Sequence, residues 1–119
     1  MKYVQLSNST GTFVSPDDKA FKAAAAGADW SKSFYQILTN QPGKDSWPIT
    51  GATFILMHKV QDKPMQATTT LKFFDWAYNQ GDKTASNLDY VPMPDSVKAV
   101  IMKAWGEIKD SSGKAITFK

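Results

Sequence analysis

The run WPITGATFILMHK, residues 47–59, constrains the fold of this chain more than any other feature. It starts beside a proline and ends in an unbroken apolar cluster at residues 54–57. Successive side chains of a strand point to opposite faces, so a continuous apolar stretch is typical of a strand covered on both sides. The sequence therefore predicts a strand here and requires other segments to cover both of its faces.

The length and composition predict one folded domain. A chain of 119 residues with 42% hydrophobic and 13% aromatic residues is too apolar for a disordered protein. There is no cysteine, which excludes disulfides, thiol catalysis and cysteine-based zinc sites. No apolar run reaches the length of a membrane span, and the first residues lack the apolar region of a signal peptide. We therefore expect no membrane insertion.

The charge pattern argues against nucleic-acid recognition. The net charge is +3, yet all 14 basic residues are lysine. Arginine supplies the planar fork that grips phosphate or guanine with two hydrogen bonds, and it is absent. The lysines are also dispersed along the chain, so we interpret them as a solvated surface and expect no nucleic-acid partner.

The first half shows signals for a short strand at residues 2–7, a turn at 8–12 and a helix at 16–26. Ser15 is positioned to cap this helix, Pro16 suits its first turn and Gly27 suits its end. A second helix is expected to begin near Ser31, because large apolar residues follow at helical spacing: Trp30, Phe34, Ile37 and Leu38. Residues 39–46 are expected to form a loop.

The second half predicts two helices. Residues 67–80 form an amphipathic pattern that ends at Gly81, and residues 82–93 are expected to be an irregular linker. Residues 94–96 open a last helix with a wide apolar stripe, and Lys98 is placed outside that stripe. The remaining tail is polar, and we expect it to be loose.

The search for chemistry finds no catalytic or metal-binding constellation. His58 is the only histidine and lacks partner ligands, so a structural or surface role is favoured. The GKDS sequence at residues 43–46 is similar to the end of a phosphate-binding loop but lacks its first glycine and precedes the predicted strand. No arrangement places two carboxylates in one pocket. The residues therefore predict no enzyme, no cofactor, and no catalytic, ligand-binding or metal-binding residue.

Long ordered blocks carry a family resemblance: ADWSK, WPIT, TFIL, FFDWAY with its glycine, and IKDSSGK. Through these blocks the chain, from about Tyr3 onward, closely resembles the C-terminal part of the periplasmic phosphate-binding proteins of proteobacteria. These are the receptors of the high-affinity phosphate ABC importer. The resemblance implies an α/β fold of two lobes joined by a hinge, with phosphate bound between the lobes. It also implies a periplasmic location, inorganic phosphate as the ligand of the full-length protein and the transporter permease as its partner.

The resemblance assigns the segments of this chain to incomplete lobes of a type II-like fold. Residues 1–46 correspond to the closing part of the second lobe, 47–60 to a hinge crossover strand, and 61–119 to the C-terminal helices of the first lobe. The flexing positions are then Pro48, Thr50, Gly51 and Ala52.

The family's phosphate-gripping groups precede this part of the protein, so the resemblance carries no phosphate ligand onto any residue here. It implies a phosphate receptor present as a C-terminal fragment that lacks those groups. The alternative is a stand-alone interaction module that oligomerises through its aromatic residues. Incomplete lobes would expose apolar faces, so oligomerisation or an exchange of elements is expected for the isolated chain.

Overall fold

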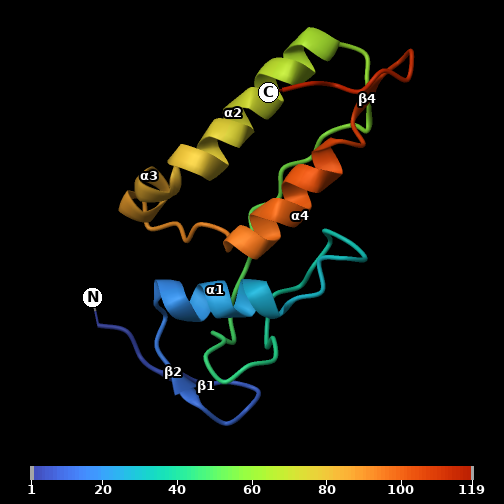
Figure 1. Ribbon diagram of the computed structural model, residues 1–119. Coiled ribbons are helices and arrows are strands. Elements are labelled where there is room, and N and C mark those ends of the chain that lie inside the picture. The colour runs from blue at the N-terminus through green and yellow to red at the C-terminus, as the bar shows by residue number, and fades with distance from the viewer. Residues whose placement is uncertain (1, 119) are drawn as a thin grey trace. The chain divides into compact units, whose positions relative to one another are not determined.

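The computed structural model describes residues 2–118 (Figure 1). It contains four helices and four short strands in the order β1 (Leu6–Ser7), β2 (Phe13–Val14), α1 (Asp18–Gly27), β3 (Val60–Gln61), α2 (Pro64–Gln80), α3 (Asp82–Asn87), α4 (Asp95–Trp105) and β4 (Lys109–Asp110). The described chain divides into two compact units. Unit 1 holds the residues up to Thr53 together with Val91–Val97, and unit 2 holds Phe54–Tyr90 together with the residues from Lys98 onward.

Unit 1 is built on a hairpin and a helix. β1 and β2 pair antiparallel, with Leu6 opposite Val14 and Ser7 opposite Phe13. The turn predicted at residues 8–12 joins them, and Gly11 takes a positive φ of 77° there, which glycine adopts without strain. A small core forms where Val14, Ala20 and Trp47 are buried together with the partly buried Leu6 and Phe21. Of the strand predicted at residues 2–7, only the last two residues form a strand.

The side chain of buried Asn8 ties the hairpin turn to a distant loop. Its Oδ1 accepts hydrogen bonds from the backbone N–H of Thr10 (3.0 Å) and of Thr12 (3.2 Å). Its Nδ2 donates to three backbone carbonyls of the loop, those of Gly43 (3.2 Å), Lys44 (2.9 Å) and Ser46 (3.2 Å). One primary amide therefore satisfies backbone groups from two segments more than 30 residues apart.

Helix α1 confirms the expected helix with a different cap. The N-cap is Asp17, whose Oδ1 accepts the N–H of Ala20 at 2.9 Å, and not Ser15 as the sequence suggested. The helix ends at Gly27, and Ala28 is its C-cap. Asp17 is the better cap because its carboxylate also interacts favourably with the positive end of the helix dipole.

The helix predicted to begin near Ser31 is absent, and this prediction is wrong. Short polar side chains bind the local backbone instead: Asp29 Oδ1 accepts the N–H of Ser31 at 3.1 Å, and Ser33 Oγ accepts the N–H of Tyr35 at 3.0 Å. The amide of Gln36 donates to the carbonyls of Asp29 and Ser33. Such bonds compete with the helical ladder for the same backbone groups.

The strand predicted over residues 47–59 is also absent from the structure. Within residues 2–118, the backbone of residues 51–57 makes no hydrogen bond to another protein group. A strand is defined by pairing with a neighbour, and within residues 2–118 no strand pairs with this run. The lobe assignment given to this run by the family resemblance stays a prediction.

Unit 2 has its own core beneath α2. Ala67, Leu71, Ile108 and Ile116 are buried together, and Met57, Trp105 and Phe118 pack against them. β3 and β4 form a parallel ladder of two residues on each strand, with Val60 opposite Lys109. The tail folds back on β4: the N–H of Ile116 donates to the Ile108 carbonyl at 3.0 Å. The expectation of a loose tail is therefore wrong, because Ile116 belongs to the core.

The helices of unit 2 are longer and more continuous than expected. α2 begins at Pro64, three residues earlier than predicted, with the proline in its first turn. Gly81 ends α2 and directly precedes α3, so residues 82–87 are helical and not part of an irregular linker. The N–H of Gly81 donates to the Ala77 carbonyl at 2.8 Å. A Cβ at position 81 would collide with that carbonyl, so only glycine fits this junction.

We predict that Asn8→Ala will destabilise unit 1. The substitution leaves the buried Ser46 carbonyl without its partner and removes four part-buried hydrogen bonds, at a cost of about 1–3 kcal/mol. Hydrogen exchange of residues 8–14 and 43–47 will report the loss, with the exposed Asn87→Ala as the control. Equal exchange in the two variants would contradict the role given to Asn8.

Candidate functional site

The predicted hinge residues lie on a segment that is anchored at its start. The backbone N–H of Trp47 donates to the Ala20 carbonyl at 3.0 Å, and the Pro48 carbonyl accepts the N–H of Asn40 at 2.9 Å. Thr50 is buried, and its Oγ1 donates to the Trp47 carbonyl at 3.1 Å. The segment is therefore fixed to unit 1 as far as Thr50.

The anchoring stops after Thr50. Gly51 is exposed, and a Cβ added at this position would have no atom within 4 Å. Its φ angle is not positive. Ala52 is half-buried, and the division between the two units falls between Thr53 and Phe54. Neither a lack of room for a side chain nor the backbone angle therefore requires glycine at position 51.

The turn at residues 43–46 does not have the chemistry of a phosphate loop. A phosphate loop presents backbone N–H groups to the anion. Here the carbonyls of Gly43, Lys44 and Ser46 converge on the amide of Asn8, and Ser46 Oγ donates to the Pro42 carbonyl at 3.0 Å. Gly43 has a φ of 118°, which explains why glycine stands in the GKDS sequence.

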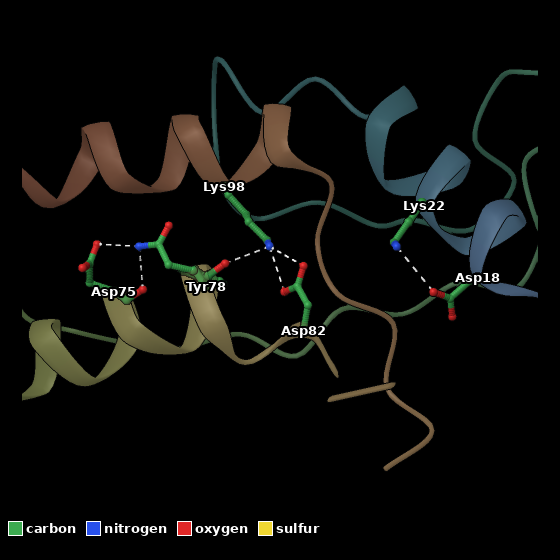
Figure 2. Close-up of polar contacts among 7 residues, drawn as sticks. Asp18, Lys22, Asp75, Tyr78, Asp82 and Lys98 are labelled. Atoms are coloured by element: carbon green, nitrogen blue, oxygen red, sulfur yellow. Dashed lines mark hydrogen bonds and ion pairs between the residues drawn. The ribbon is translucent and has the colours of Figure 1, made fainter. Parts of the chain in front are cut away.

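The start of α1 is occupied by the chain's own carboxylates. Asp17 caps the helix, and Asp18 lies in its first turn and pairs with Lys22 at 3.4 Å (Figure 2). An open pocket beside this helix is lined by both Asp17 and Asp45, with Lys19 3.5 Å from Asp45. Two carboxylates facing one paired ammonium disfavour an anionic ligand.

Lys98 is a buried cation of unit 2. Its Nζ donates to both carboxylate oxygens of Asp82 at 2.8 Å and to the backbone carbonyl of Tyr78 at 2.9 Å (Figure 2). The Lys98 side chain is only 9% exposed, whereas that of Asp82 is 55% exposed. The sequence placed Lys98 outside the apolar stripe of the last helix, but its side chain is buried. The ammonium joins α4 to the α2–α3 junction and is already neutralised there.

Two exposed acids of unit 2 have lowered pKa values. Asp110 lies in the IKDSSGK block, and its Oδ1 accepts hydrogen bonds from Ser112 and Lys114, which lower the pKa of its carboxyl. The hydrogen bond and the charge of Lys59, 2.9 Å away, lower the pKa of Glu107 in the same manner. Both are exposed and fully explained by turn and surface contacts, so they do not define a catalytic pair.

His58 is exposed, and in the part of the chain that the structure describes no three histidine, cysteine or acidic side chains gather as metal ligands. Residues 2–118 contain no helix of the length and apolarity needed to cross a membrane.

Comparison with known proteins gives one consistent result. A phosphate-binding protein named PstS from Pasteurella multocida is 44% identical over 119 residues, which cover 98% of this chain and 35% of that protein. Proteins of the same name from Haemophilus influenzae and Xylella fastidiosa are 43% and 42% identical over 107 residues, or 88% of this chain. The chain spans about a third of the length of these relatives. No family model matches it.

The short strands, the helices and these matches define part of an α/β periplasmic-binding-protein fold. Within that class the chain is related to the PstS phosphate-binding proteins over almost all of its residues. The resemblance and the fold class predicted from the sequence blocks are thereby confirmed.

The sequence did not reveal the two polar residues that organise the structure, Asn8 and Lys98. Each binds at least one segment distant in sequence, and neither lies in a motif. Only a signal that links positions far apart in the sequence would have identified these two residues.

We predict that Asp82→Asn will destabilise unit 2 by about 1–2 kcal/mol. The substitution keeps the shape but leaves the buried ammonium of Lys98 with a weaker partner; the partial exposure of Asp82 keeps the cost below that of a fully buried pair. Denaturant unfolding will measure it. Asp75→Asn, which alters a surface contact with Asn79 on α2, is the control and should change stability by less than about 0.5 kcal/mol.

We predict that Tyr78 titrates above the ordinary tyrosine range, because burial raises the pKa of its hydroxyl. Since the folded pKa is raised, this contribution to stability is complete below about pH 10 and is lost as pH rises through the folded value. Tyrosinate absorbance should lose its most alkaline component in Tyr78→Phe and keep it in the exposed Tyr90→Phe. The backbone bond to Lys98 survives both substitutions. An unchanged titration in Tyr78→Phe would contradict the assignment.

Proposed function

We propose that the chain is part of a phosphate receptor for ABC import, a binding protein and not an enzyme. The observation that supports this most directly is the 42–44% identity to proteins named as phosphate-binding, over 88–98% of the chain. By the family resemblance such a receptor works in the periplasm and delivers inorganic phosphate to the transporter permease.

We assign this chain the supporting role in that receptor. Residues 1–46 would close the second lobe, 47–60 would cross the hinge, and 61–119 would supply first-lobe helices. The proposed hinge comprises Pro48, Thr50, Gly51 and Ala52. The change from anchored to unpartnered backbone after Thr50 supports flexing at Gly51 and Ala52, whereas Pro48 and Thr50 lie on the anchored side. The division into two compact units just after these residues supports it as well.

We assign no phosphate ligand to this chain. A dehydrated phosphate needs several convergent donors, most effectively an arginine fork with backbone N–H groups. The sequence has no arginine, the 43–46 turn presents carbonyls, and the buried ammonium of Lys98 is held by Asp82. The phosphate-gripping groups would then belong to the part of the relatives' length that this chain does not match.

The second candidate is an assembly module, and exposed apolar side chains favour it. Phe73 and Trp76 lie with ring centroids 6.1 Å apart on α2 and are each more than half exposed. Met65 on the same helix is 84% exposed. Clustered apolar exposure of this kind is typical of a surface that another polypeptide covers.

We predict that the chain alone will show no stoichiometric phosphate binding in isothermal titration at micromolar concentration. The reason is the absence of arginine from the sequence and the carbonyl groups that the turn at residues 43–46 presents. Sulfate serves as the comparison anion. Binding of phosphate at micromolar or tighter affinity would contradict the supporting role. Light scattering on the same sample addresses the second candidate, which requires a defined oligomer.

A further inference from the structure

The backbone at the division between the two units is accessible without any opening of the fold. Within residues 2–118, the backbone of residues 51–57 has no hydrogen-bond partner in the protein. All residues from Thr53 to Leu56 are exposed, and Leu56 is 92% exposed. A folded segment normally has to open before another protein can bind its backbone. Among the described residues, that opening costs no hydrogen bond here.

Both ends of this accessible segment are fixed. On one side, the buried side chain of Thr50 is hydrogen-bonded to unit 1. On the other side, Met57 packs against the core of unit 2, and the Lys59 carbonyl accepts a hydrogen bond from β4. The accessible stretch is therefore short, and the bond between Phe54 and Ile55 has exposed residues on both sides.

This stretch has the chemistry that an endoprotease requires of a substrate. An extended peptide binds to a second protein through main-chain hydrogen bonds, and pockets for alternate side chains give specificity. Residues 53–56 offer unpaired backbone groups and the large apolar side chain of Phe54. No proline lies between residues 49 and 63 to block an extended conformation or remove an N–H.

Most of the other exposed aromatic residues lie in backbone that is already occupied. Phe73 and Trp76 belong to helix α2. The N–H of Tyr35 is held by a serine side chain, and that of Tyr90 by a carbonyl of α3. Tyr3 has only two residues before it, which leaves little chain for an extended binding cleft. Accessibility and side-chain chemistry therefore coincide best at Phe54.

We propose that the bond between Phe54 and Ile55 is a processing site for an endoprotease that selects large apolar residues. Hydrolysis there consumes one water molecule, breaks the peptide C–N bond, and leaves a carboxylate on Phe54 and an amino group on Ile55. The buried core residues of unit 1 precede this bond, and those of unit 2 follow it. Each core is therefore retained within one product. The proposal is independent of phosphate binding and of the receptor role.

The test digests the native chain with a trace of chymotrypsin and identifies the first products by intact mass. We expect residues 1–54 and 55–119 as the first pair. Ile55→Pro removes the N–H of the cleaved bond and should slow this cut at least about thirtyfold, whereas Ile55→Ala should change it by less than about threefold. Both variants alter an exposed residue whose N–H has no partner within residues 2–118, so neither disturbs a core.

Low concentrations of urea separate local access from global unfolding. Below the unfolding transition, the rate of the first cut should stay within about twofold, relative to a short peptide substrate in the same urea. A rate that rises in parallel with the unfolded population overturns the proposal. A first cut at any other bond, or equal cleavage of the two Ile55 variants, overturns it too. A rate constant that falls as the chain concentration rises also contradicts it, because a second copy then covers the segment.

Discussion

The availability of backbone hydrogen-bond partners governs this structure. Where a partner is supplied, even by one side chain, the chain becomes fixed: the amide of Asn8 binds carbonyls of Gly43, Lys44 and Ser46 and holds two remote segments together. Where the described residues supply no partner, as at residues 51–57, apolar character and β-branched residues do not produce a strand. Burying an unpaired peptide group costs more than the burial of its side chain returns, so unpaired segments remain at the surface.

This requirement explains which parts of the fold could be predicted. The helices at residues 18–27, 64–80 and 95–105 satisfy their own backbone, so proline, acidic and glycine signals near their ends were sufficient to find them. The absent helix after Ser31 had the correct apolar spacing, but the side chains of Asp29, Ser33 and Gln36 captured its backbone groups. The absent strand at 47–59 depended on neighbours that cannot be read from its own residues.

The features of the candidate site could likewise be predicted only in part. Ordered sequence blocks were sufficient to identify the relationship to phosphate-binding proteins, because they do not depend on the folded contacts. The roles of Asn8 and Lys98 were not predictable, since each acts through residues far along the chain. The hinge assignment at Pro48, Thr50, Gly51 and Ala52 comes from the family relationship and remains a proposal. The loss of backbone partners after Thr50 supports it at Gly51 and Ala52 alone.

The four tryptophans give the two units separate optical signals. Trp30 and Trp47 are buried in unit 1, and the indole Nε1 of Trp30 donates to the Ala25 carbonyl at 2.7 Å. Trp105 lies in unit 2, stacked on Tyr78 at 5.7 Å and edge-on to Phe118 at 5.3 Å, while Trp76 is exposed. Burial and ring contacts shift indole emission, so the wavelength of fluorescence distinguishes the cores from the surface. Variants that retain one indole can therefore follow the melting of each unit by itself, with no attached dye.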